Sequence, residues 1–74
     1  KDNAIIYTDN THIYIDNIFG DAIINIYDIK GNIVAQHSTN DSDYTISTES
    51  MSRKIYIVNV IDNNGSYTQK IAIR

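Results

Sequence analysis

Apolar side chains recur at every second residue along most of this chain, in short runs that end at clusters of Asp, Asn, Gly, Ser or Thr. A period of two places apolar side chains on one face of an extended strand, whereas a helix needs a spacing of three and four. No stretch keeps the helical spacing, so we predict an all-β protein. Seven runs qualify as strands: Ala4–Thr8, His12–Ile15, Ala22–Ile29, Ile33–His37, Tyr44–Ser47, Lys54–Ile61 and Ser66–Ile73.

The apolar residues are of the kind that strands favour. The chain has 74 residues, among them 16 Ile and 6 Tyr, and it lacks Leu, Trp, Cys and Pro. β-Branched and aromatic side chains pack well on a pleated surface. A domain of this length hides only about 60% of the surface that its unfolded chain exposes, so its core must be thin.

Two of the runs are predicted to be interior strands of a sheet. In both Ala22–Ile29 and Lys54–Ile61, apolar residues occupy the two faces of the strand. In the second run Tyr56, Val58 and Val60 share one face. This pattern is typical of a strand covered on both faces, and it predicts that both runs lie in the middle of a sheet.

Glycines mark two predicted hairpins. Gly31 lies between the third and fourth runs, where its lack of a side chain permits a positive φ. The segment Asp62–Gly65 ends in Asn-Gly, the pair that most readily supplies the two positive φ angles of a type I′ turn. We therefore predict a type I′ hairpin at Asn64 and Gly65.

Seven short strands at roughly ten-residue spacing predict a compact seven-stranded antiparallel Ig-like β-sandwich, with residues 1–74 forming a single domain. Because the chain opens at Lys1 without an initiator Met, we expect a fragment or a processed product. The absence of Pro removes one of the usual features that prevent edge strands from pairing with another chain. An edge strand such as Ile5–Thr8 is therefore a candidate for pairing with, or swapping into, a second copy to form a homodimer.

Charge and composition argue against several classes of function. The formal net charge is −3 and the pI is about 4.9, which argues against a nucleic-acid-binding protein and a polybasic membrane anchor. The absence of Cys excludes a disulfide scaffold and thiolate chemistry, and two His are too few for a three-His zinc site. No apolar run approaches the ~18 residues of a membrane-spanning helix.

The chain offers no strong signal of catalysis. Ser, His and Asp are all present, but a catalytic triad is recognised by geometry and not by composition. We interpret His12 as a polar residue on a half-exposed strand face and His37 as a solvated strand end. The Asp- and Asn-rich segments at residues 40–43 and 62–65 lack the bidentate Glu of an EF-hand loop. We therefore predict no catalytic residue, no metal and no cofactor.

Several segments, in their order along the chain, resemble one family. Ile26–Val34 resembles the Ile-Tyr-Asp-x-x-Gly-x-x-Val segment of the type IX secretion system C-terminal sorting domains of Bacteroidetes. Lys54–Val60 is similar to the central Tyr-Ile-Val strand of that family, and Asn63–Gly65 to its hairpin. Lys70–Arg74 is similar to its C-terminal strand, which ends in a basic residue.

The resemblance implies that the chain is a signal for secretion rather than an enzyme. It implies that the domain is the C-terminal part of a larger exported protein, such as an adhesin or a gingipain-like cysteine protease. Sec would carry the precursor to the periplasm, and the type IX outer-membrane translocon would read the domain. A surface sortase would then remove it, and the cargo would be secreted or held on the outer membrane, commonly on anionic lipopolysaccharide.

The same resemblance assigns candidate site residues. It assigns translocon recognition to the C-terminal strand, residues Lys70, Ile71, Ala72, Ile73 and Arg74. Motif or turn roles fall to Asp28, Gly31, Tyr56 and Gly65. The alternative reading is a non-catalytic Ig- or fibronectin-like adhesion or binding module, which the seven-strand pattern also fits.

Overall fold

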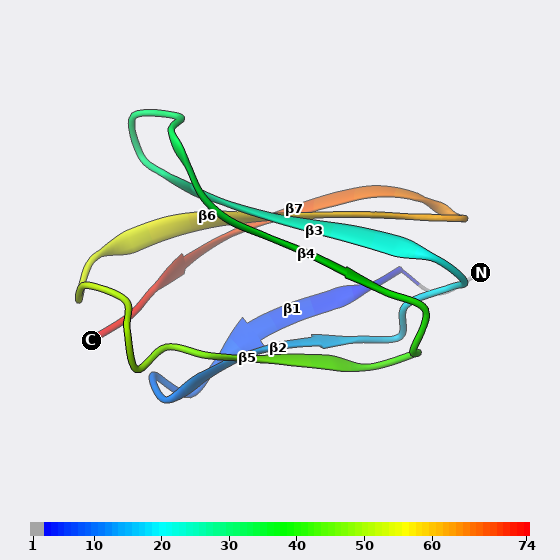
Figure 1. Cartoon of the computed structure of the whole chain (residues 1–74), viewed down its shortest axis with the longest axis horizontal. Helices are drawn as coiled ribbons and strands as arrows, with labels where there is room; N and C mark the ends of the chain where they lie inside the picture. Colours follow the sequence, from blue (N-terminus) through cyan, green and yellow to red (C-terminus); the bar gives the residue numbers. More distant parts are fainter. Residues whose placement is uncertain (1–2) are drawn as a thin grey trace.

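Seven strands form two antiparallel sheets that face each other in the computed structural model, which describes residues 3–74 (Figure 1). One sheet has the strand order β1-β2-β5 and the other has the order β4-β3-β6-β7. The strands are β1 (Ile5–Thr8), β2 (His12–Asp16), β3 (Ala22–Asp28), β4 (Ile33–Thr39), β5 (Tyr44–Ser47), β6 (Ile55–Asp62) and β7 (Gly65–Ala72). This arrangement confirms the predicted all-β sandwich, and each observed strand matches its predicted run to within two residues.

The core is the layer of side chains between the two sheets. It takes alternate residues from each strand, so that Ile13 and Ile15 of β2 face Ile24 and Ile26 of β3 across the sandwich. These four isoleucines are fully buried. Full burial of one such side chain stabilises a fold by about 1.5–3 kcal/mol, so a short row of them accounts for much of the stability of so small a domain.

The central positions of β3 and β6 are confirmed, and the outer face of β3 is partly covered, as predicted, at Asn25 and Tyr27, but the prediction that β6 is covered on both faces is wrong. β3 lies between β4 and β6, and β6 lies between β3 and β7. On the outer face of this sheet, however, Ile23 is 45% exposed and Ile61 is 46% exposed. In a two-layer sandwich each sheet is covered on one face only, so apolar residues on the second face remain in contact with solvent.

The hairpin between β6 and β7 forms where predicted, but it does not contain a type I′ turn. Its two turn residues are Asn63 and Asn64, and neither has a positive φ. Gly65 follows the turn as the first residue of β7, with φ of 154°. The Asp62 carboxylate explains this geometry, because its Oδ1 accepts hydrogen bonds from the N–H groups of Asn64 (2.8 Å) and Gly65 (3.1 Å). An Asx turn thus replaces the expected Asn-Gly turn.

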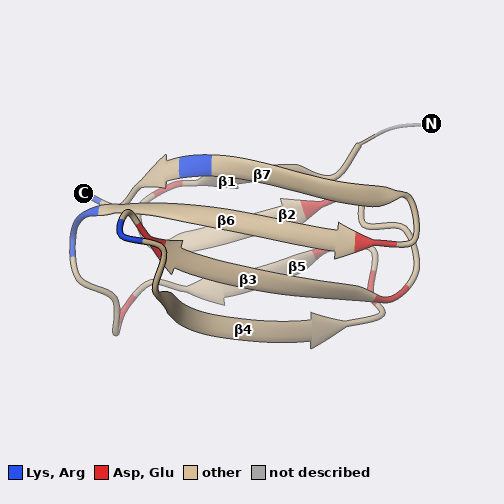
Figure 2. Cartoon of the chain, turned by 90° about the horizontal axis from the view of Figure 1, so that it is seen from above, with Lys and Arg blue, Asp and Glu red and all other residues tan. Residues whose placement is uncertain are grey.

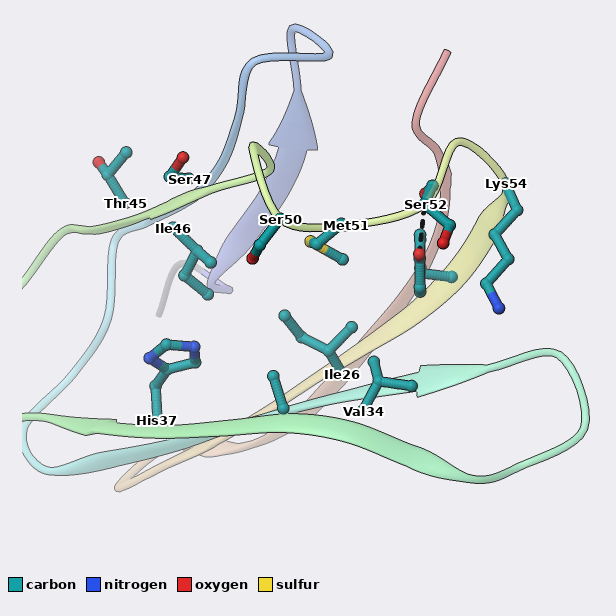
Figure 3. Close-up of a pocket in the computed structure, with 12 residues that line it drawn as sticks. Ile26, Val34, His37, Thr45, Ile46, Ser47, Ser50, Met51, Ser52 and Lys54 are labelled. Carbon is teal, nitrogen blue, oxygen red and sulfur yellow. Dashed lines mark hydrogen bonds between the residues drawn. The ribbon is translucent and has the colours of Figure 1, made fainter.

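His37 is not the solvated strand end that the sequence predicted. β4 continues to Thr39, so the alternation turns His37 inward, and its Nδ1 lies 3.2 Å from the Tyr44 hydroxyl of β5. Figure 3 shows the ring beside a groove of about 540 Å³ between the edges of β4 and β5, above Ile26 and Val34. His12 is half-buried as expected, with its ring tilted against Tyr14.

The edge of β1 lies on the other side of the sandwich, where β1 contacts β7 (Figure 2). β1 is an edge strand, as predicted, and its Ile5 is exposed. Pairing or swapping of this strand between two copies stays a prediction.

A single buried charge should unfold the domain. Val58 of β6 is completely buried, and Val58→Asp would place an unpaired carboxylate in the core at a cost of several kcal/mol. That cost is close to the whole stability, ~5 kcal/mol, of a small domain. We expect no cooperative thermal unfolding transition by circular dichroism. The matched control is Ile61→Asp on the outer face of the same strand, which should still melt cooperatively; a native-like melt of Val58→Asp would contradict the assigned core.

Candidate functional site

The structure brings most of the predicted site residues to one end of the sandwich. Because β3, β6 and β7 are antiparallel neighbours, the end of β3, the start of β6 and the end of β7 coincide: Asp28 pairs with Tyr56, and Tyr56 pairs with Ile71. We call this the motif end, defined by residues 28–32, 53–56 and 70–74. Gly65 lies at the opposite end of β7 and is not part of it.

Asp28 shapes the turn at the motif end. Its Oδ1 accepts hydrogen bonds from the N–H groups of Lys30 (2.9 Å) and Asn32 (3.0 Å), and its Oδ2 accepts one from the Asn32 side chain (3.2 Å). The bonds from Asn32, together with the N–H of Lys30 and the charge of Lys54, hold the pKa of the Asp28 carboxyl below its usual value. Gly31 completes the turn with φ of 92°, a conformation that disfavours residues with a Cβ.

Tyr56 is a core residue whose polar end supports the neighbouring loop. The ring is buried, and its hydroxyl donates a hydrogen bond of 2.8 Å to the carbonyl of Ser52. The ammonium group of Lys54 lies 5.6 Å from the ring centroid, within the range of a cation–π contact. Tyr56 therefore fixes the chain before β6 and presents little surface to a partner.

The last five residues divide into core and surface. Ile71 is 7% exposed and Ile73 is 2% exposed, so both side chains belong to the core. Lys70 and Arg74 are exposed, and Ala72 is half-buried. In the folded domain these three residues are accessible, whereas the side chains of Ile71 and Ile73 are enclosed in the core.

Asn10 holds the C-terminus in place, a role that the sequence did not reveal. The backbone N–H of Arg74 donates a hydrogen bond to Asn10 Oδ1 (3.0 Å). The Asn10 carbonyl accepts two more, from the Arg53 side chain (3.0 Å) and from the Thr48 hydroxyl (2.7 Å). Asn10 adopts φ of 76° in the turn between β1 and β2, which Asn tolerates better than most residues. The only signal in the sequence was its place in a polar turn cluster.

The outer face of the three-stranded sheet carries a pair of tyrosines. The rings of Tyr7 and Tyr14 stack with centroids 5.0 Å apart. Their hydroxyls donate hydrogen bonds of 2.8 Å to Asp16 and Asp9, respectively. Hydrogen bonds from the Thr11 side chain, from Tyr14 and from the backbone lower the pKa of the Asp9 carboxyl. Both tyrosine hydroxyls already donate to carboxylates.

Within residues 3–74, no three His, Asp or Glu side chains lie close enough to hold a metal ion. In the same part of the chain, no helix is long and apolar enough to cross a membrane.

These features define a small β-sandwich with a hydrogen-bonded turn at Asp28 and two exposed basic residues, Lys70 and Arg74, near its C-terminus. Residues 5–74 match the family described as the secretion system C-terminal sorting domain. The chain therefore belongs to this family, which confirms the resemblance to type IX sorting domains. No curated protein matches the chain.

Membership of this family defines the kind of task that the chain performs. It is a sorting signal of type IX secretion, which interacts with the secretion machinery and directs an attached protein across the outer membrane, to the cell surface or the medium.

The Asp28 turn should make stability depend on pH. Because the pKa of folded Asp28 lies below the unfolded value of about 3.9, the ionised carboxylate stabilises the fold above that value, and this contribution is lost as the pH falls through the folded pKa. Asp28→Asn keeps an oxygen acceptor but cannot ionise. We expect the difference in Tm between wild type and Asp28→Asn to be largest at neutral pH and to shrink below about pH 4. Parallel Tm curves from pH 7 to about pH 2 would contradict this role.

Proposed function

We propose that the 74 residues act as one C-terminal export signal, that the type IX outer-membrane translocon reads the motif end of the folded domain, and that a surface sortase then removes the domain. The match to the sorting-domain family over residues 5–74 carries this proposal. We assign recognition by the translocon to the motif end because it joins three segments that lie far apart in the sequence.

The C-terminal strand has a double role in this proposal. Lys70 and Arg74 present positive charge to the translocon, while Ile71 and Ile73 hold the strand in the core. The hydrogen bond from the backbone of Arg74 to Asn10 supports this proposal, because it holds Arg74 beside the turn between β1 and β2. In this proposal the translocon therefore recognises a surface of the folded domain.

The first test is export of a periplasmic reporter that carries these residues at its C-terminus, in a Bacteroidetes host with and without an intact translocon. We expect the reporter at the surface or in the medium only when the translocon is present. Deletion of Lys70–Arg74 should abolish export. Since the deletion also removes two core side chains, the matched variant Lys70→Ala/Arg74→Ala is needed, which removes surface charge alone and should reduce export without unfolding the domain.

Retention of a folded fusion in the periplasm of the intact host would contradict the proposal and favour the adhesion-module alternative. If the double alanine variant is exported as well as wild type, Lys70 and Arg74 do not take part in recognition.

Cleavage has a separate readout. If a surface sortase removes the domain, the exported reporter should lose about the 8.4 kDa of the 74 residues, as measured by mass spectrometry. The periplasmic precursor that accumulates without the translocon should keep the full mass. An exported reporter that retains the intact domain would contradict removal.

A further inference from the structure

The outer face of the four-stranded sheet is divided by a row of polar side chains. Gln36 of β4 donates a hydrogen bond to Asn25 of β3 (2.7 Å), and Asn25 donates one to Asn59 of β6 (3.4 Å). Asn59 in turn donates to Thr68 (3.1 Å) and Ser66 (3.0 Å) of β7. The row crosses all four strands, so it separates the apolar residues of this face into two groups.

The group beside the motif end is larger, and it includes the two most exposed residues of both groups. The strand registers place Tyr27 opposite Ile33 on one side and opposite Ile57 on the other, and Ile55 follows on the same face of β6. Ile29 is 68% exposed, Ile33 54% and Ile55 39%. We call these residues the isoleucine patch: Tyr27, Ile29, Ile33, Ile55 and Ile57. Ile29 and Ile55 also line a hollow of about 510 Å³.

Lysines surround the isoleucine patch. Lys30 and Lys54 line the same hollow, the Lys54 ammonium group on the side of the Tyr56 ring, and Lys70 pairs with Ile57 at the edge of β7. All three are exposed. Figure 2 shows the basic residues gathered at the end of the sandwich that holds the C-terminus. The carboxylate that borders the hollow is that of Asp28, and three N–H donors of its own turn already engage it.

A surface with an apolar centre and a cationic border is complementary to a partner with the matching apolar and acidic groups. We propose that the isoleucine patch and its three lysines form the docking surface for a protein of the secretion machinery that presents an apolar patch bordered by carboxylates. This inference rests on the proposed function and names the face that the machinery covers. Charge complementarity carries it, because carboxylates opposite Lys30, Lys54 and Lys70 would fix the register of the complex and speed its formation.

The same charges disfavour a second copy as the occupant. A symmetric dimer through this face would bring lysines close to lysines, and like charges across an interface are unfavourable. A lipid surface is also disfavoured. The patch has no Trp, Phe or Leu, which are common on the apolar face of membrane-surface helices, and all its residues except Ile29 belong to strands of the sheet.

The test uses the reporter fusion in the intact host. Two variants remove the proposed contacts: Ile29→Ser/Ile33→Ser removes exposed apolar surface, and Lys30→Glu/Lys54→Glu/Lys70→Glu reverses the border charge. We expect each to lower the exported fraction about tenfold or more, as loss of interface hot spots does. The corresponding Lys→Gln triple variant should fall less than the Lys→Glu variant, because it removes attraction without adding repulsion.

The matched control is Ile23→Ser/Ile61→Ser, which removes similar apolar exposure from the same face beyond the polar row. It should be exported like wild type, and thermal melts of all variants must show a folded domain. If wild type is exported and the folded patch variants are exported equally well, the docking surface is wrong while the sorting function stands. If wild type is not exported, the proposed function itself fails.

Two further outcomes would also overturn the docking surface. One is binding of the purified wild-type domain to anionic phospholipid vesicles that the patch variants lose. The other is a wild-type dimer, detected by analytical ultracentrifugation, that the patch substitutions dissociate.

Discussion

The fold depends on one thin layer of β-branched side chains between two sheets. Seven short strands form only two layers, so each sheet is covered on one face. The inner residues Ile13, Ile26 and Val58 are fully buried, whereas Ile23 and Ile61 on the outer face are not. No third layer covers the outer face of the four-stranded sheet. Apolar side chains on this face therefore stay accessible to a partner.

Turns rather than strands set the geometry of the motif end. Asp28 organises its turn through three N–H donors, and Asn10 gathers the Arg53 side chain, the Thr48 hydroxyl and the end of the chain. These bonds lie at the surface, where each contributes modestly. The bonds to Asp28 hold the turn that carries Lys30, and the bonds to Asn10 hold the side chain of Arg53 and the backbone of Arg74.

In the C-terminal strand, the residues proposed for recognition alternate with residues that stabilise the fold. Its alternation sends Ile71 and Ile73 into the core and leaves Lys70 and Arg74 outside. A deletion therefore removes stability and charge together, whereas substitution of the outward residues changes charge alone. An export defect of the deletion can therefore come from unfolding, whereas an export defect of the substituted domain points to the lost charge.

The sequence by itself determined the seven strands, the two hairpins, the inward faces of β2 and β6 and the family, because alternation and turn residues are local features of the chain. Only the tertiary structure decided which apolar residues stay exposed, that His37 turns inward to meet Tyr44, that Asn10 holds Arg74, and that an Asx turn displaces Gly65 from the hairpin turn. Each of these depends on a layer or a hydrogen-bond partner that the chain meets only after folding. A period of two shows that two faces differ, but the number of layers decides which of them water reaches.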